Sequence, residues 1–340
     1  MTFTPVQMIG TQRSGSNLLR LMLNQLDGVS APHPPHILER FFPLLPVYHY
    51  LSVSANFAQL VNDICKLIEF NPVQWTGLNL DPNAIIARCN RPLLTEIFRV
   101  IYEMRAESEN SSIWICKSLV NIRFADQLEE NGVNPLYIHL YRDGRDVALS
   151  FKKAIVGEKH MYHIAKQWKE EQEASLLLAD RLGNERVLKI RYEYLLAAPE
   201  TELQKICSFI GATYNPVAMD YHHSEESHKT ALSGVMWKNV EKPVLTNNHD
   251  KFKRELTPSD ILLFEQVAGE TLEKLDYSLT FPQNGLHVFS SEEIKSFSEL
   301  NTKLKHEARL QQKPEDMEKR KKLEEHLMNI QARIKYVQGE

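Results

Sequence analysis

The chain has 340 residues, a formal net charge of −4 at pH 7, and 43% hydrophobic and 25% charged residues. A chain of this length can bury a large core, and the composition is that of an ordinary globular protein. The negative balance argues against broad nucleic-acid binding, which needs a basic face to displace counterions. A local basic pocket for one anionic small molecule remains compatible with it.

The spacing of the cysteines and the length of the apolar runs indicate the cellular compartment of the protein. The cysteines lie far apart and show no metal-binding spacing, which favours reduced thiols in a cytoplasmic protein: Cys65, Cys89, Cys116 and Cys207. Residues 1–9 lack the basic and apolar regions of a signal peptide. No apolar run approaches the roughly 20 residues that cross a bilayer. We therefore expect a cytoplasmic protein without a membrane span.

Short apolar runs alternate with helical patterns along most of the chain. We predict strands at residues 6–9, 113–116, 135–141 and 186–191. Helical patterns occupy residues 16–26, 146–155, 163–182 and 199–210. Residues 54–110 are mostly helical, with interruptions at Asn71-Pro72, Trp75 and Asp81-Pro82. The Pro-rich residues 31–46 favour a loop or short helices. The alternation predicts an α/β, P-loop-like three-layer fold with a central parallel sheet flanked by helices, which binds ligands where its strands end.

The alternating pattern weakens after Phe281, and we divide the chain into a main domain at residues 1–285 and a charged helical C-terminal extension at 286–340. An apolar seam runs through the extension at Leu323, Leu327, Ile330, Ile334 and Val337. Two heptads are too few for an independent coiled coil. A pair of helices, split near Pro314, either packs on the main domain or forms a homodimer contact through residues 291–340.

The first predicted strand leads into the loop Gly10-Thr-Gln-Arg-Ser-Gly-Ser-Asn17. Such a loop between a strand and a helix points backbone N–H groups and the helix N-terminus at one spot, which suits a phosphate. In P-loop nucleotide enzymes, a lysine and a Mg²⁺-binding hydroxyl residue follow the second glycine. Here Ser16 and Asn17 follow Gly15, and the basic residue, Arg13, lies inside the loop. The loop therefore lacks the Mg²⁺-binding residue that a P-loop kinase would need.

A second pattern, Tyr141-Arg-Asp-Gly-Arg-Asp-Val-Ala-Leu-Ser150, follows the third predicted strand. Arg142 at the strand end and Ser150 along the following helix can reach one phosphate, through a charge-assisted fork and a hydroxyl. Alternatively, the segment is only a helix start, with Asp143 or Asp146 as its cap and Arg145 in solvent.

Together the two segments resemble the sulfotransferases that use 3′-phosphoadenosine 5′-phosphosulfate (PAPS), most closely their bacterial and tyrosylprotein-type branch. The early loop resembles the 5′-phosphosulfate loop of that family, and the second pattern resembles its 3′-phosphate motif. Further similarity lies in Tyr192-Glu-Tyr-Leu195, Pro199-Glu200, Phe209-Ile-Gly211 and Trp237-Lys-Asn239. The resemblance covers roughly residues 5–280.

The resemblance implies that a sulfuryl group moves by in-line displacement from PAPS to a hydroxyl or amine of an acceptor, with no metal cofactor. It implies that the 5′-phosphosulfate is held by Arg13, Ser14, Gly15, Ser16 and Asn17. It also implies that Arg142 and Ser150 hold the 3′-phosphate and that Tyr192 lies near the adenine. Two residues depart from the family pattern: Gln12 replaces a common proline, and Arg13 replaces the lysine of the cytosolic branch.

The catalytic candidates are two cations and one base. Positive charge near the leaving oxygen stabilises sulfuryl transfer, and Arg13 and Lys117 are suited to supply it. In the tyrosylprotein-type branch the base lies about twenty residues past the loop, a position that His33 occupies here. The ordinary pKa of histidine, about 6.5, suits a base at neutral pH. His36 and Glu39 lie close by as further candidates.

The acceptor and two alternative functions remain open at this point. We expect the acceptor pocket to draw on Phe41, Phe42, Tyr48, Tyr50 and residues near Trp75. Their aromatic character favours an apolar or sugar-like acceptor (a small molecule, glycan or lipid), although core packing explains it at least as well. The alternatives are a P-loop-type nucleotide kinase and a catalytically inactive nucleotide-binding protein that uses its C-terminal helices for assembly. The intact set of Arg13, Lys117, Arg142 and Ser150 argues against the inactive protein.

Overall fold

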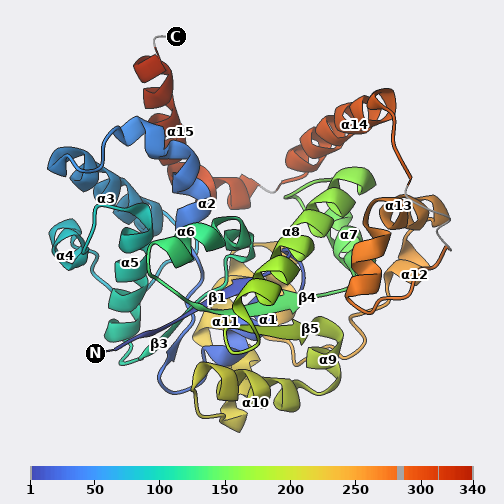
Figure 1. Ribbon diagram of the computed structural model, residues 1–340, viewed down its shortest axis with the longest axis horizontal. Coiled ribbons are helices and arrows are strands. Elements are labelled where there is room, and N and C mark those ends of the chain that lie inside the picture. The colour runs from blue at the N-terminus through green and yellow to red at the C-terminus, as the bar shows by residue number, and fades with distance from the viewer. Residues whose placement is uncertain (1, 282–286, 313, 339–340) are drawn as a thin grey trace.

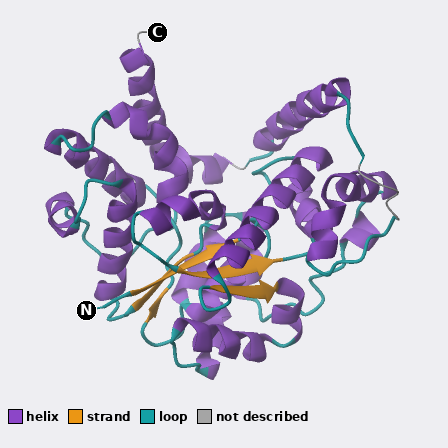
Figure 2. Cartoon of the chain, in the orientation of Figure 1, coloured by secondary structure: helices purple, strands orange, loops and turns teal. Residues whose placement is uncertain are grey.

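A parallel β-sheet lies at the centre of the computed structural model, which describes residues 2–281, 287–312 and 314–338, without the side chains of 235, 236 and 334–338. The strands follow the order β2-β3-β1-β4-β5, and every pair is parallel. They are β1 (Thr4–Ile9), β2 (Val29–Ser30), β3 (Ile113–Cys116), β4 (Leu136–Tyr141) and β5 (Val187–Arg191). Figure 2 shows these strands surrounded by helices.

The helices before the middle of the chain are α1 (Ser16–Leu23), α2 (Ile37–Phe41), α3 (Ser54–Glu69), α4 (Pro82–Arg88), α5 (Leu94–Ser108), α6 (Ala125–Glu130) and α7 (Gly144–Lys153). Those that follow are α8 (Met161–Leu182), α9 (Tyr192–Ala197), α10 (Pro199–Ile210), α11 (Glu225–Leu232), α12 (Phe252–Glu255), α13 (Pro258–Lys274), α14 (Ser291–Leu310) and α15 (Pro314–Gln338). In the described part of the chain, short 3-10 helices join them at η1 (Phe42–Tyr48), η2 (Leu119–Phe124), η3 (Pro216–His223) and η4 (Val235–Glu241).

Alternate residues of the central strands pack on opposite faces of the sheet, as the period of two in a strand requires. Val6 and Met8 pack with α1, α10 and η3, whereas Ile9 packs with η2 and α8 on the other face. Figure 1 shows helices on both sides of the strands. The predicted three-layer α/β fold is therefore confirmed.

Most predicted elements are present, with small shifts at their ends. The four predicted strands are β1, β3, β4 and β5, and the sheet also contains β2, whose two residues are too short to leave a pattern. The Pro-rich segment forms α2 and η1. α10 has Pro199 at its first turn and ends at Gly211, whose φ of 76° is the left-handed conformation that glycine accommodates.

The two C-terminal helices pack on different parts of the main body (Figure 1). α14 lies against α8, where the ring of Phe297 stacks on His160 with centroids 4.7 Å apart. α15 lies against η1 and α3, and its Leu323 and Ile330 are buried in their core. The apolar seam of the C-terminal extension therefore packs on the main domain at Leu323 and Ile330, which is one of the two arrangements expected from the sequence. The domain boundary predicted at 285/286 and the side chains of Ile334 and Val337 lie outside the described residues.

No helix in the described part of the chain combines the length and the apolar character that a membrane crossing requires.

Candidate functional site

Two loops that bear arginine meet where the central strands end, and the strand register explains why. β1 pairs with β4 so that Ile9 lies opposite His139, and the loop after β1 therefore starts beside the end of β4. Gly10 has a φ of 126°, and a Cβ atom there would lie 2.3 Å from the carbonyl oxygen of Leu140. Only glycine allows this close approach between the loop and the neighbouring strand.

The end of β4 also lies beside the end of β5, because Tyr141 pairs with Arg191. Arg142 and Tyr192, the next residues of the two strands, are therefore neighbours, and the Arg142 guanidinium carbon lies 4.7 Å from the centroid of the Tyr192 ring. The same ring also lies against Gly15, where a Cβ atom would be 2.3 Å from Tyr192 Cε2. The tyrosine thus joins the early loop to the second arginine-bearing segment. Its hydroxyl accepts a hydrogen bond from Asn248 Nδ2 at 2.8 Å.

Arg13 and Arg142 are held together by hydrogen bonds. Arg13 Nε donates to the hydroxyl oxygen of Ser150 at 3.0 Å. Arg142 Nη1 donates to the carbonyl oxygen of Arg13 at 3.3 Å, and its Nη2 donates to the carbonyl of Asn248 at 2.9 Å. Burial and the charge of Arg142 lower the pKa of Arg13. The two segments therefore form one site of concentrated positive charge.

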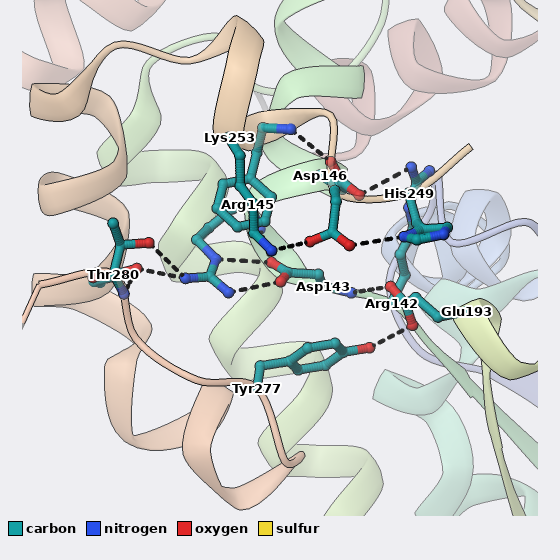
Figure 3. Close-up of polar contacts among 12 residues, drawn as sticks. Arg142, Asp143, Arg145, Asp146, Glu193, His249, Lys253, Tyr277 and Thr280 are labelled. Carbon is teal, nitrogen blue, oxygen red and sulfur yellow. Dashed lines mark hydrogen bonds and ion pairs between the residues drawn. The ribbon is translucent and has the colours of Figure 1, made fainter. Parts of the chain in front are cut away.

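The turn that carries Arg142 is fixed by a buried polar network (Figure 3). Asp143 caps α7 by accepting a hydrogen bond from the backbone N–H of Arg145 at 2.9 Å. Arg145 is not in solvent: it pairs with Asp143 at 2.7 Å and with Glu265 at 2.6 Å. The backbone N–H of Asp143 donates to Glu193 at 3.1 Å. Asp143 and Arg145 thus hold the turn in place, while Arg142 pairs with Asp146 at 3.5 Å and lines a cavity.

A cavity of about 910 Å³ opens between the strand ends, α2, α7, the 233–251 segment and α15. Its volume is near the upper end of small-molecule sites, which span about 300–1,000 Å³. Nearly all predicted site residues line it: Arg13, Gly15, Ser16, Asn17, His33, Lys117, Arg142, Ser150 and Tyr192. Ser14 does not, because its side chain is fully buried behind the loop. His36 and Glu39 also line the cavity.

The lining carries far more positive than negative charge, although the whole chain is acidic. Among the described residues the cations are Arg13, Arg40, Lys117, Arg142, Lys153, Lys251 and Arg320. The carboxylates are Glu39, Asp146 and Glu324. Buried polar atoms at the strand-end part of the cavity lack hydrogen-bond partners in the described structure, among them Asn17 Oδ1 and Arg142 Nε. These groups are suited to an anionic ligand that carries hydrogen-bond donors and acceptors.

Lys117 follows β3 and enters the cavity beside the early loop, since Cys116 pairs with Gln7 of β1. Burial and the charges of Arg20 and Arg13 lower its pKa to about 7. An amine with this pKa exchanges protons near neutral pH, and a bound anion would favour its charged form.

His33 faces the cavity with both ring nitrogens buried and without hydrogen-bond partners among the described residues. Burial and the nearby charges of Lys117 and Arg20 hold its pKa well below its ordinary value, so the imidazole is neutral but is a weaker base than an ordinary histidine. His36 differs, because its Nδ1 is engaged by Ser118 Oγ at 3.1 Å and Glu39 at 3.2 Å. The backbone at His33 is fixed by Trp75, whose Nε1 donates to the His33 carbonyl at 2.7 Å.

The predicted acceptor pocket is wrong for its four named aromatic residues, none of which lines the cavity: Phe41, Phe42, Tyr48 and Tyr50. The first three pack in the core with α3 and α5, and Tyr50 is 80% exposed. Residues near Trp75 do line the cavity, as predicted, namely Asn71, Pro72 and Val73. The cavity wall there consists instead of Pro43, Leu44, Val73 and residues of α15.

Sequence reasoning missed several lining residues. Asn248 follows no recognisable pattern. Arg320, Leu323 and Leu327 belong to the apolar and basic pattern of the C-terminal helix, but that pattern does not say what the helix contacts. Trp237, noted from its family-like position, lines the cavity with its ring centroid 6.2 Å from that of His33.

Within the described residues, no group of three or more His, Cys, Asp or Glu side chains is placed to hold a metal ion.

Comparisons with known proteins agree with this geometry. Two solved structures share the fold: a sulfotransferase domain from the Synechococcus PCC 7002 olefin synthase and one from the curacin biosynthetic pathway. The first is 22% identical, with a TM-score of 0.57 over 82% of this chain and 96% of that one. The second is 20% identical, with a TM-score of 0.53 over 82% of this chain and 99% of that one. Among proteins of curated function, no sequence matches the chain.

A sequence model described as the sulfotransferase family matches residues 5–216, which is more than half of the chain. The match includes the early loop, Lys117, the Arg142 segment and Tyr192. It does not favour the kinase or the inactive assembly protein. The chain belongs to the sulfotransferase family.

Proposed function

We propose that this sulfotransferase takes its sulfuryl group from PAPS and transfers it in line to a hydroxyl or amine of an acceptor. The observation that carries the proposal is the meeting of the two arginine-bearing segments in one cavity, where Arg13 Nε and Ser150 Oγ are 3.0 Å apart. A donor with phosphates at both ends of a nucleoside needs two such anion-binding segments, whereas an ordinary nucleoside triphosphate needs one.

The residues present fit this donor. Arg142 and Ser150 hold the 3′-phosphate, and the unpartnered Nε of Arg142 leaves a donor for it. The 5′-phosphosulfate is held by Arg13, Ser16, Asn17 and backbone N–H groups of the loop, at the N-terminus of α1. Ser14 contributes through its backbone, since its side chain is buried behind the loop. Tyr192 lies near the adenine, a role supported by its place in the lining.

The chain's own groups then account for the chemistry. When bound, PAPS supplies the sulfuryl group and a nucleotide leaving group. Arg13 and Lys117 place positive charge where negative charge develops on the leaving oxygen. His33 takes the proton of the acceptor hydroxyl through a ring nitrogen that has no hydrogen-bond partner among the described residues. The cavity holds these groups in one orientation, and orientation is a large part of catalysis in group transfer.

A thermal-shift comparison tests the donor. We expect 3′-phosphoadenosine 5′-phosphate (PAP) to raise the Tm more than ATP with Mg²⁺ does, since a ligand at 100 times its Kd stabilises a fold by about 2.7 kcal/mol. Arg142→Ala should abolish the PAP shift. Arg181→Ala, which removes an exposed arginine paired with Asp126 at 2.6 Å, should leave it unchanged. A larger shift with ATP would overturn the proposal.

Two less central parts of the proposal concern location and assembly. We place the protein in the cytoplasm, which the four unpaired cysteine thiols support. A homodimer through residues 291–340 stays a prediction, and light scattering with the intact chain tests it.

A further inference from the structure

The C-terminal helix α15 forms a wall of the cavity, although it lies outside residues 5–216 that match the family. Arg320, Leu323 and Leu327 line the cavity from this helix. They face Arg40, Pro43 and Leu44 of α2 and η1 across the part of the cavity away from the strand ends. The helix therefore bounds the region that remains for the acceptor.

α15 is fixed in this position by polar contacts on both sides of its cavity-lining turns. Arg333 Nη2 donates to Asp63 Oδ2 at 2.6 Å, and His326 Nε2 lies 2.9 Å from the Asp63 carbonyl oxygen. Tyr48 donates to the same Asp63 carboxylate at 2.8 Å. Towards the start of the helix, Lys319 Nζ donates to the carbonyl of Leu232 at 2.9 Å. With Leu323 and Ile330 buried, the helix is a fixed wall rather than a loosely attached segment.

Arg40 and Arg320 bring two half-buried guanidinium groups into this region. In the described part of the chain no carboxylate lies within ion-pair distance of either, whereas Arg88, Arg99 and Arg181 each pair with one at 2.6 or 2.7 Å. Burial lowers the pKa of Arg40, and the opposing charges of Glu39, Arg320 and Glu324 act on it as well. Since neither arginine is ion-paired within the described residues, both guanidinium groups keep hydrogen-bond donors for an anionic ligand.

This pair lies on the acceptor side rather than the donor side. Arg320 is 5.9 Å from the centroid of the Trp237 ring, and that ring lies 6.2 Å from the ring of His33. Arg320 is also among the charges that lower the pKa of His33. By contrast, Arg13 and Arg142 are joined to Ser150 and Asn248 at the strand ends. Glu39 and Glu324 lie near enough to raise the pKa of Arg40, but neither forms an ion pair with Arg40 or Arg320 in the described structure, and Glu39 instead contacts His36 at 3.2 Å.

We propose that Arg40 and Arg320 form an anion subsite for the acceptor, which is an amphipathic molecule with a carboxylate or phosphate group and an apolar chain. The anionic group pairs with the two arginines, and the chain lies on Leu44, Leu323 and Leu327. This assignment rests on the proposed function, since it places the acceptor hydroxyl at His33. Arginine forks recognise both carboxylate and phosphate, and the experiment separates the two.

Calorimetry with the intact protein saturated with PAP tests the subsite. The probes are 12-hydroxydodecanoate, dodecyl phosphate and the uncharged 1,12-dodecanediol. We expect an anionic probe to bind about tenfold to a hundredfold more tightly than the diol, as charge-assisted hydrogen bonds predict. Tighter binding of the carboxylate or of the phosphate tells which anion the acceptor carries, and either result supports the subsite.

Two variants locate the effect. Arg320→Gln should remove the preference for the anionic probe and leave PAP affinity unchanged. Lys322→Gln removes the same charge from the exposed side of the same helix and should change neither quantity. The subsite would be overturned if the three probes bind equally or if none of them binds. Weaker PAP binding by Arg320→Gln would also overturn it. Absence of any Tm shift with PAP would instead overturn the proposed donor, and the acceptor assignment with it.

Discussion

Arg13 and Ser150 lie 137 positions apart in the sequence, and the guanidinium Nε of the first donates to the hydroxyl of the second at 3.0 Å. The contact joins the loop after β1 to the helix after β4. It also places the Ser150 hydroxyl, which we assign to the 3′-phosphate, next to Arg13, which we assign to the 5′-phosphosulfate. Both residues should therefore matter for nucleotide affinity.

We predict that Ser150→Ala weakens PAP binding about tenfold, because a hydrogen bond to a charged partner contributes about 1.5–3 kcal/mol. Arg13→Gln should weaken it further, and the double variant should lose less than the sum of the two, since the residues share a contact. Calorimetric Kd values check this. An unchanged Tm of the free protein is the control for folding, and wild-type affinity in Ser150→Ala would contradict the assignment.

Gly15 and Gly28 provide a matched pair for testing the loop. Both have positive φ, 89° and 75°, but only Gly15 has a neighbour, Tyr192, within reach of an added Cβ. We predict that Gly28→Ala costs about 1–2 kcal/mol of unfolding free energy from backbone strain alone and leaves PAP affinity intact. Gly15→Ala should in addition displace Tyr192 and weaken PAP binding. Denaturant unfolding and calorimetry measure the two effects, and equal PAP affinity in both variants would contradict the prediction.

The depressed pKa of Lys117 predicts a pH-dependent stability. The folded value is about 7, below its value in the unfolded chain, because burial and the charges of Arg20 and Arg13 disfavour the ammonium form. The folded state therefore binds fewer protons than the unfolded state up to about pH 10.4. Above about pH 10.4, Lys117 is neutral in both states and does not lower the free energy of unfolding. As the pH falls below this value the unfolded chain takes up the proton first, and the loss of stability is complete at about pH 7.

Lys117→Met should consequently be more stable than the wild type at pH 7, with a difference that shrinks toward pH 10. Its PAP affinity should be lower at pH 7, because the bound anion favours a charged Lys117. Unfolding of the ligand-free protein across this pH range measures the first effect, and calorimetry measures the second. A difference in stability that does not depend on pH would show that Lys117 titrates normally.

Variants of His33 and His36 test which of the two histidines acts as the general base. We predict that His33→Asn lowers kcat by about 10²–10⁴, the usual contribution of general acid–base catalysis, and leaves the Kd for PAP unchanged. His36→Asn should have a smaller effect, since Ser118 and Glu39 already engage its ring. Because the pKa of His33 is held well below its ordinary value, activity should persist below pH 6.5. Near wild-type turnover in His33→Asn would remove it as the base.

The sequence predicts well which residues meet at the strand-end part of the cavity, which we assign to the donor, and predicts poorly the part near α15, which we assign to the acceptor. In a parallel sheet, loops that follow neighbouring strands must meet at one edge, so Arg13, Lys117 and Arg142 converge once the strands are recognised. The acceptor end depends on how separate helices pack. Phe41 and Tyr48 have the composition of a binding pocket but serve the core, and nothing in the local pattern of Arg320 indicates that it lies near His33.

Sequence patterns also fail where a buried polar group serves only the scaffold. Arg145 reads as a solvent-exposed residue after a helix cap, but it pairs with Glu265, 120 positions further along the chain. Likewise, Asn301 of α14 accepts hydrogen bonds from the backbone N–H groups of Lys159 and His160 at 2.9 and 3.0 Å. Such long-range pairs leave no periodic trace.

The position of α15 has a consequence for the order in which the protein becomes functional during synthesis. The elements that form the donor end, from β1 to the 248–251 segment, all precede this helix in the chain. A nascent chain can therefore build a nucleotide site before its acceptor wall has left the ribosome. Acceptor selection would then be the last property that the molecule gains, and the first that it loses when α15 detaches from α3.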